Sequence, residues 1–253
     1  EELAKLNRDR QKVQREIIAD AMEIIKEQQL QEKSIIVLQN DDWNRGVVGV
    51  AAGKCIETHY RPTILLSGDG DELVGSARSI SGFSIYDAIS ACKEHVVKFG
   101  GHDMAAGLCV ARDRFDDFVA AITEYANEHI SPDQLVKTVR PDAFAELDEI
   151  TQGSAVDIEK VGPFGIGNPT PIVQINNVTI DQVSVMGSKG AHLTMQLGQS
   201  NKRIRAIWWS MGDAAKQLQR GVQIDIVAKI KVNEFRGTRT AELDIIDIAL
   251  PSG

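Results

Sequence analysis

The sequence lacks three features, each of which would indicate a particular class of protein. No apolar run approaches the roughly 20 residues of a membrane span, and no signal peptide opens the chain. The three cysteines, Cys55, Cys92 and Cys109, are an odd number without the Cys-x-x-Cys spacing of zinc sites. A disulfide framework is not expected, and the sequence predicts a cytoplasmic protein without a membrane partner.

Basic residues are also in the minority, but they are unevenly placed. The 253 residues include 28 Lys and Arg against 36 Asp and Glu, a net charge of −8. Residues 171–253 carry 10 basic against 7 acidic residues, a net of +3, so the remainder carries −11. A locally basic third on an acidic protein weakly favours a nucleic-acid partner. Because residue 1 is not methionine and the chain opens inside a helical pattern, we expect a fragment of a longer protein.

Hydrophobic periodicity divides the chain into two regions with different predicted secondary structure. Strands alternate with helices of about 10 to 15 residues in the first half, which indicates an α/β domain. Short strands around one helical insert follow, which suits a small barrel of the OB type. We expect a helix over 84–98 and separate strands over 172–175 and 178–185. The predicted order is a connecting helix over 1–31, an α/β domain over 32–133, a linker over 134–170 and the barrel over 171–253.

Two glycine-rich segments, 75–79 and 100–102, contain the best polar candidates of the α/β domain. Glycine lets a backbone approach a ligand closely and direct N–H groups at it. Arginine, serine and histidine side chains hold phosphate oxygens. We therefore predict a phosphate site built from Ser76, Arg78, Ser79, Gly100, Gly101 and His102. The alternative is a pair of tight turns with an ordinary surface arginine.

The barrel offers a second set of candidates. Lys202, Arg203 and Arg205 lie close together in the sequence, and Phe235, Arg236 and Arg239 belong to a predicted hairpin tip. Single-strand binding by OB folds combines a cationic groove with aromatic stacking. Trp208 and Trp209 are adjacent, so on a strand they face opposite sides, and only one of them is expected in the core.

Several segments together resemble the C-terminal half of the RecJ family, the single-strand-specific exonucleases of the DHH phosphoesterase superfamily. The similar segments are LNRDRQKVQREIIADA, GVVGVAAGK, HYRPTILL, GSARSISGFSIYDAI, FGGHDMAAGL, GPFGIGNPTP and NEFRGTRTAELDIIDI. Each is weak alone, but their order and spacing are specific. Many family members have Ala-Ser-Arg or Ala-Ser-Lys where Ala52-Gly53-Lys54 stands, and some have histidine near Asn44, which leaves the details of residues 43–54 open.

The resemblance implies an N-terminal DHH catalytic domain in the parent chain that holds Mn²⁺ or Mg²⁺. No Asp-His-His triplet is present here, so we expect this fragment to bind no cofactor and to be inactive alone. The α/β domain is then the DHH-associated domain, whose glycine-rich segments bind substrate phosphate. The resemblance implies the substrate-binding and DNA-guiding part of a 5′-to-3′ single-stranded-DNA exonuclease that acts in DNA repair and recombination.

Other interpretations of single residues and of the whole chain stay open. His102 as a metal ligand lacks a nearby His, Cys or Glu at ligand spacing. Trp43 could stack a base, although burial is the simpler interpretation. The breaker-rich segment 162–169 is better interpreted as a hinge than as a phosphate loop, because no Lys-Ser or Lys-Thr follows it. The whole chain could also be a non-catalytic module that binds a nucleotide or a protein partner.

Overall fold

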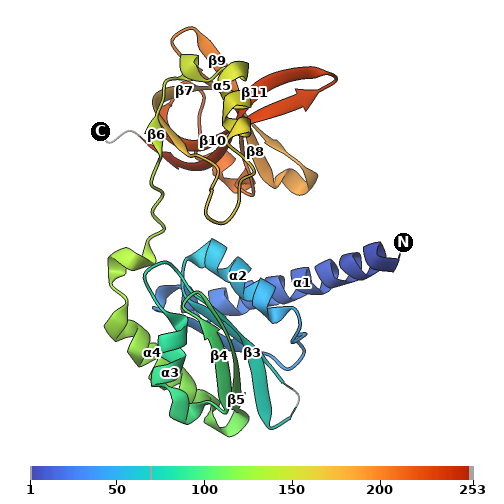
Figure 1. Cartoon of the computed structure of the whole chain (residues 1–253), viewed down its shortest axis with the longest axis vertical. Coiled ribbons are helices and arrows are strands. Elements are labelled where there is room, and N and C mark those ends of the chain that lie inside the picture. The colour runs from blue at the N-terminus through green and yellow to red at the C-terminus, as the bar shows by residue number, and fades with distance from the viewer. Residues whose placement is uncertain (1, 69, 251–253) are drawn as a thin grey trace. The chain divides into compact units, whose positions relative to one another are not determined.

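The structure, a computed structural model, describes residues 2–68 and 70–250, except for the side chain of Lys189. It forms two compact units, residues 1–137 and 138–253, which we describe separately (Figure 1). Over the described residues, no helix has both the length and the apolar character needed to cross a membrane.

The first unit is a mixed five-stranded sheet with helices on both faces. Its strand order is β1-β2-β3-β5-β4, with β1 and β2 parallel and the other pairs antiparallel. The strands are β1 (Ile36–Gln39), β2 (Thr63–Ser67), β3 (Glu72–Arg78), β4 (Lys98–His102) and β5 (Ala105–Ala111). The helices are α1 (Glu2–Glu27), α2 (Val48–His59), α3 (Ile85–Ala91) and α4 (Phe115–His129).

The two faces of this sheet are covered unequally. Helices α3 and α4 pack on one face, against Leu73, Ala77 and Leu108. Helices α1 and α2 lie on the other side (Figure 1), where the sheet contributes Ile36, Leu38 and Leu65 to their core. That core reaches β1 and β2, and α2 also lies over part of β3. On the same face, Lys98, Gly100 and His102 of β4 and Gly107 of β5 remain exposed, whereas Cys109 of β5 is buried. We call this outward side of β3, β5 and β4 the open face.

Helix α1 follows the apolar periodicity of its sequence only in its second half. Ile17, Ala21 and Ile25 recur every four residues, so they share one side of the helix, and all three are buried against the side of α2 that contains Ala51 and Cys55. Residues 2–12 are exposed. The long connecting helix predicted from the sequence is confirmed.

The sequence predicted one helix over 84–98, and this is wrong in its second half. Helix α3 ends at Ala91, a 3₁₀ turn follows, and residues 98–102 form the edge strand β4. The N–H of Val97 already donates to the Cys109 carbonyl at 2.8 Å. Alanine, lysine, glutamate and histidine up to residue 95 suit a helix, so the change to strand is decided by pairing with β5. The glycine-rich segment 100–102 is therefore the end of a strand.

The second unit is a closed five-stranded barrel, as the sequence predicted. Its strands are β7 (Val173–Met186), β8 (His192–Gln199), β9 (Lys202–Trp208), β10 (Gln223–Phe235) and β11 (Thr238–Ala249). They follow the order β7-β8-β9-β11-β10, and β10 pairs with β7 to close the barrel. The β11–β9 pair is parallel and the others are antiparallel, which is the Greek-key pattern of the OB fold.

Strand β7 joins two segments that the sequence separates at Asn176-Asn177. Asn177 has a φ of 54°, and the pairing register with β10 shifts at this point. Such a bulge bends a long strand without ending it, as barrel closure requires. Asparagine tolerates this left-handed conformation, and the same property makes it resemble a turn in the sequence.

Part of the predicted linker packs on the barrel. Strand β6 (Ala143–Phe144) pairs with β7, and helix α5 (Gln152–Lys160) follows. Leu147, Ile150 and Ala155 are buried in the barrel core. The structure therefore places residues 138–170 with the second unit, because these scattered apolar residues complete its core.

Candidate nucleic-acid interface

Register brings most of the predicted phosphate residues onto the open face. Arg78, Ala105 and His102 form one row across β3, β5 and β4, and Ser76, Gly107 and Gly100 form the next. Directly paired residues point to the same side of a sheet, and so do residues two apart on one strand. The two glycine-rich segments, 25 positions apart in sequence, are therefore neighbours in space.

The first turn of α2 lies directly over two of these side chains. A Cβ atom on Gly49 would lie 2.9 Å from Arg78 Nη2 and 3.0 Å from Ser76 Oγ. Only glycine permits this approach without displacing them. Arg78 is half-buried and donates from Nη1 to its neighbouring Ala77 carbonyl at 2.8 Å. The guanidinium is thus held in place at the edge of the open face.

His102 is exposed at the end of β4, and its orientation is set by the hairpin turn. Its Nδ1 accepts the N–H of Met104 at 3.3 Å, so the neutral ring carries its proton on Nε2. Asp103 fixes this hairpin turn: its carboxylate accepts a hydrogen bond from the Ser84 hydroxyl at 3.0 Å, and its backbone carbonyl accepts one from the Ile85 N–H at 2.9 Å. His102 can therefore present one N–H donor to an anion beside Arg78.

Two of the predicted residues do not join the open face. Ser79 is buried and donates its hydroxyl to the Phe83 carbonyl at 2.6 Å. Gly101 points to the α3–α4 side, where a Cβ would lie 2.3 Å from the Ala105 carbonyl oxygen. Because side chains alternate along a strand, residues 76 and 78 share a face from which residue 79 is excluded. The same alternation separates Gly101 from Gly100 and His102, because residues 98–102 form strand β4.

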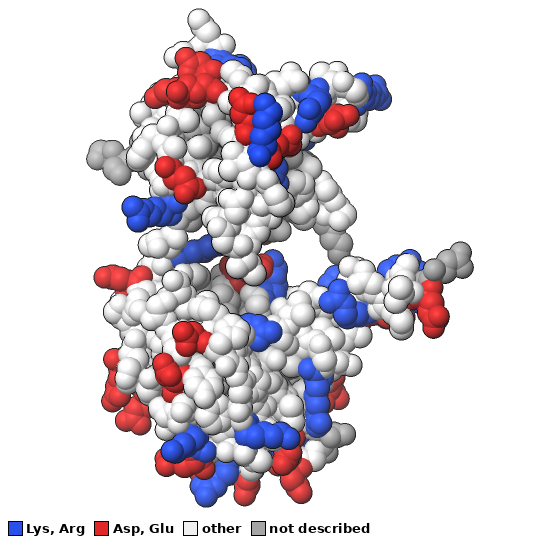
Figure 2. All heavy atoms as spheres, in the orientation of Figure 1, with Lys and Arg blue, Asp and Glu red and all other residues white. Residues whose placement is uncertain are grey.

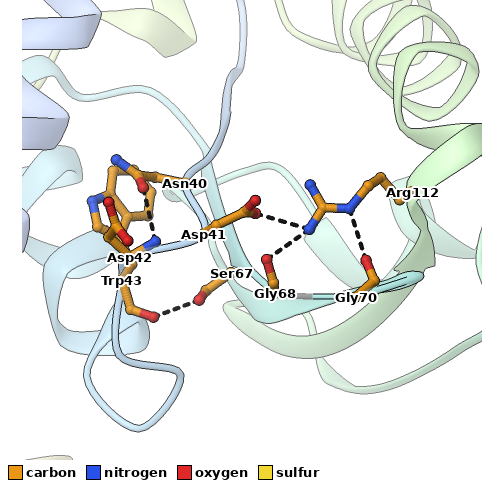
Figure 3. A network of polar contacts seen from close by, with 8 residues as sticks. All are labelled: Asn40, Asp41, Asp42, Trp43, Ser67, Gly68, Gly70 and Arg112. Carbon is orange, nitrogen blue, oxygen red and sulfur yellow. Dashed lines mark hydrogen bonds and ion pairs between the residues drawn. The ribbon is translucent and has the colours of Figure 1, made fainter.

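A polar network fixes the loop that leads from β1 into α2 (Figure 3). Arg112 donates to the carbonyls of Gly68 and Gly70, at 2.6 and 2.7 Å, and pairs with Asp41 at 2.9 Å. Trp43 is buried, and its Nε1 donates to Asp20 of α1 at 2.6 Å. Burial, the simpler interpretation of Trp43, is therefore confirmed, and this loop fixes where α2 begins.

The barrel carries its own candidate surface. A groove of about 400 Å³ is lined by strands β8, β9 and β11 and by the start of α5, and its lining includes Lys202, Arg203, Arg205 and Arg239. We call it the cationic groove. Two sets of basic residues that are more than 30 positions apart in sequence thus line one groove. The structure assembles the predicted cations but also supplies each arginine with a partner.

Three of the four cations in this groove are paired with carboxylates. Arg203 pairs with Asp181, Arg205 pairs with Glu242 at 2.9 Å, and Arg239 pairs with Glu159 at 3.1 Å. On the face in view, Figure 2 shows basic and acidic side chains side by side over the barrel. The attraction for a polyanion is therefore smaller than the local net charge suggests, since phosphate must compete with these carboxylates.

Glu242 is the most buried of these three carboxylates. Burial raises the pKa of Glu242 above its ordinary value, and Arg205 acts in the opposite direction. Asp244 raises this pKa further, whereas Lys231 lowers it. The carboxylate is thus held between two cations but has lost much of its hydration.

The predicted hairpin tip is confirmed. Phe235 pairs with Thr238, and the two residues between them, Arg236 and Gly237, have φ angles of 52° and 79°. Two successive positive φ angles define a type I′ turn, which accounts for the glycine. Phe235 is 65% exposed, and the Arg236 guanidinium lies 5.1 Å from its ring centre. An exposed ring beside a cation is the combination that stacks bases.

The adjacent tryptophans do face opposite ways. Trp208 packs against the barrel core, whereas Trp209 is 48% exposed. The Trp209 indole donates to Asp244 at 2.9 Å and meets the His192 ring edge-on. Trp209 is thus the exposed member of the pair.

The described residues contain no cluster of three or more His, Cys, Asp or Glu that could hold a metal ion. His102, the candidate weighed from the sequence, has the backbone N–H of Met104 on Nδ1. The described part of the chain therefore offers no donor set that fits the two-metal chemistry of phosphodiester hydrolysis.

Comparison with known proteins assigns the two units. Residues 32–128 match the DHHA1 domain family, and residues 141–247 match the RecJ OB domain family. The chain belongs to the RecJ family. It is 30% identical over 251 residues to the single-stranded-DNA-specific exonuclease RecJ of Bacillus subtilis, covering 98% of this chain and 32% of that protein. For RecJ of Haemophilus influenzae the identity is 28%, covering 99% of this chain and 45% of the relative.

A solved structure supports the same fold. The crystal structure of RecJ in complex with Mg²⁺ from Thermus thermophilus aligns over the whole chain with a TM-score of 0.79 and 23% identity, and the alignment covers 38% of that protein. The chain spans less than half of the length of these RecJ relatives. The α/β domain and the OB barrel therefore correspond to the DHHA1 and OB domains of RecJ proteins, and the connecting helix precedes the DHHA1 match.

Sequence reasoning missed Lys98 and Gly107 of the open face, and Gly49 of α2, which lies over it. Gly49 is identified only by its distance to Arg78 and Ser76. Lys98 follows from an alternation, Lys-x-Gly-x-His over 98–102, that becomes readable once this segment is a strand. Gly107 is recognised by its pairing with both Ser76 and Gly100.

Proposed function

We propose that this chain is the substrate-binding and DNA-guiding part of a metal-dependent 5′-to-3′ single-stranded-DNA exonuclease that acts in DNA repair and recombination in the cytoplasm. The observation that carries the proposal is the row of Arg78 and His102 beside Ser76 on the open face of a DHHA1 domain. The metal-holding DHH domain belongs to another part of the parent protein, with Mn²⁺ or Mg²⁺ as its ion.

The open face suits one phosphate group of a DNA strand. Arg78 offers charged N–H donors, Ser76 a hydroxyl and His102 the Nε2–H, and all three point to the same side of the sheet. Charge-assisted hydrogen bonds of this kind are about twice as strong as neutral ones. The first turn of α2 adds the positive end of a helix beside Arg78 and Ser76.

The barrel suits the continuing single strand. Lys202, Arg203, Arg205 and Arg239 line one groove, and Phe235 with Arg236 forms an exposed tip on strands of the same barrel. A groove whose cations neutralise the DNA phosphates, together with exposed rings on which bases stack, binds single strands without selecting particular bases. We further propose that the chain divides in function into residues 1–31, 32–133, 134–170 and 171–253. Residues 134–170 connect the two binding parts along the chain, and from residue 138 on they pack with the barrel.

Binding of a 5′-phosphorylated oligothymidylate, measured by fluorescence anisotropy over a salt series, tests this function. The logarithm of the association constant should fall linearly with the logarithm of salt, by about 0.7 for each phosphate neutralised. Arg78→Ala should weaken binding. Binding that is indifferent to salt and strand length would instead favour a non-catalytic module for a nucleotide or a protein partner.

The isolated chain should not digest a labelled single strand when Mn²⁺ is added, because the described residues gather no set of metal ligands. The assay needs protein free of contaminating nuclease, with a RecJ exonuclease as positive control. Metal-dependent digestion by the purified chain would contradict the assignment of catalysis to another domain.

A further inference from the structure

Two glycines on the open face are not required by the fold. Gly100 of β4 and Gly107 of β5 are directly paired, both are exposed, and neither has a positive φ. A Cβ on Gly100 would meet no atom within 4 Å, and one on Gly107 only the Gly75 carbonyl oxygen at 3.9 Å. Glycine weakens a strand interior, so its presence here without a steric cause needs another reason.

Other glycines of the same sheet show the contrast. A Cβ on Gly75 would lie 2.0 Å from the Leu65 carbonyl oxygen, and one on Gly101 would lie 2.3 Å from that of Ala105. Backbone atoms of neighbouring strands exclude any side chain at both positions. Gly100 and Gly107 instead leave a bare strip of backbone that is open to solvent, which is the arrangement that allows a flat ligand to approach a sheet closely.

This strip lies between two rows of functional groups. Gly100 and Gly107 share a row of paired residues with Ser76 of β3. The row that contains Arg78 and His102 is two residues away in one direction along the strands, about 7 Å, and the row that contains Val74 and Lys98 is two residues away in the other. A shallow hollow of about 330 Å³ opens there, lined by residues that include Val74, Lys98 and Gly107. We call the sheet surface between these two rows the floor; it extends about 13 Å from the Arg78 row to the Lys98 row.

The far end of the floor carries positive charge, partly offset by one carboxylate. Burial raises the pKa of the Cys109 thiol, and its hydrogen bond to Glu72 at 3.3 Å raises it further. Lys98 and Arg45 act on this thiol in the opposite direction, so both cations lie near it. Lys98 is exposed and directly paired with Cys109 on the open face.

We propose that the strip of Gly100 and Gly107 receives the base of the nucleotide whose phosphate Arg78 holds, and that Lys98 binds the next phosphate of the strand. The inference rests on the proposed function and adds a nucleotide subsite to it. The base lies flat on the bare backbone, with Val74 at its edge. A side chain at position 100 or 107 would lift the base away and break this contact.

The test uses Gly107→Val in the 253-residue chain, with two 5′-phosphorylated oligothymidylates that differ only in an abasic first nucleotide. The wild type should bind the base-bearing probe about 5-fold more tightly or better, equivalent to about 1 kcal/mol, the lower end of base-stacking energies. Gly107→Val should bind both probes equally. Gly107→Ala tests the same contact if the valine variant fails to fold, and Gly70→Ala, another glycine with open space around it, is the matched control.

Lys98→Ala gives an independent readout. It should make the salt dependence shallower by about 0.7, one phosphate contact, whereas Lys5→Ala on the exposed part of α1 should leave it unchanged. If Gly107→Val keeps the wild-type preference for the base while Arg78→Ala weakens binding of both probes, the subsite is wrong and the phosphate site stands. If Arg78→Ala also binds as the wild type does, the proposed function itself fails.

Discussion

Asp181→Asn should increase the affinity of the barrel for single-stranded DNA. Asp181 of β7 pairs with Arg203 of β9, which lines the cationic groove. Asparagine keeps the size and an acceptor oxygen but removes the charge, so Arg203 becomes available to a phosphate. The substitution thus tests whether the ion pairs of the groove limit DNA binding.

The magnitude follows from the exposure of the pair. The side chains of Arg203 and Asp181 are 49% and 30% exposed, and pairs of this kind contribute about 0.2–1 kcal/mol. Releasing Arg203 should therefore tighten binding by up to about 5-fold. One more neutralised phosphate should steepen the salt dependence by about 0.7, which adds about 2.6-fold to the loss of affinity between about 50 and 200 mM salt.

Anisotropy of labelled oligothymidylate measures both quantities. The control is Asp157→Asn, which breaks the exposed pair with Lys160 on α5 at the same change of net charge. Lys160 does not line the groove. Equal affinities and equal salt slopes for the two variants would show that Arg203 is not in the DNA path.

Three further outcomes follow from the same contacts. In the full-length enzyme, Arg78→Ala and His102→Ala should each reduce turnover about 10- to 100-fold with an unchanged melting temperature, because a lost charge-assisted hydrogen bond costs about 1.5–3 kcal/mol; wild-type kinetics in both would make these residues merely structural. In anisotropy, replacing Lys202, Arg203 and Arg205 of β9 together by alanine should flatten the salt slope. Phe235→Ala should weaken binding with less change in that slope. An unchanged slope in the triple variant would place the DNA path elsewhere. Because folding raises the pKa of Glu242, its stabilising contribution is present below its unfolded pKa and is lost as pH rises through the folded value. In thermal unfolding, the stability of Glu242→Gln relative to the wild type should therefore increase as the pH rises above the ordinary carboxyl pKa of about 4.3, and a constant difference would contradict this.

The sequence predicts the fold because the apolar periods of helices and strands are local. The four-residue spacing of Ile17, Ala21 and Ile25 marks the buried side of α1, and alternating strand patterns mark the barrel. Strand β4 could not be predicted in the same way, because residues 93–95 favour helix and only pairing with β5 decides otherwise.

The candidate site was predictable in its residue types but not in its geometry. Arg78 and His102 are recognisable as phosphate ligands, yet their shared row depends on register across three strands. The exclusion of Ser79 follows from the same alternation once β3 is known to end at Arg78. Likewise, the carboxylate partners of Arg203 and Arg205 come from strands β7 and β11, so their neutralising effect is invisible in a local charge count.

Hydrogen exchange of the chain with and without a 5′-phosphorylated oligothymidylate tests the central claim most directly, because it reports which backbone segments the DNA covers. We predict slower exchange in residues 98–107 of the open face and in residues 202–205 and 235–239 of the barrel, and loss of the first of these effects in Arg78→Ala. Protection confined to other segments, such as β1 and the outer side of α4, would contradict the assignment of DNA binding to these two surfaces.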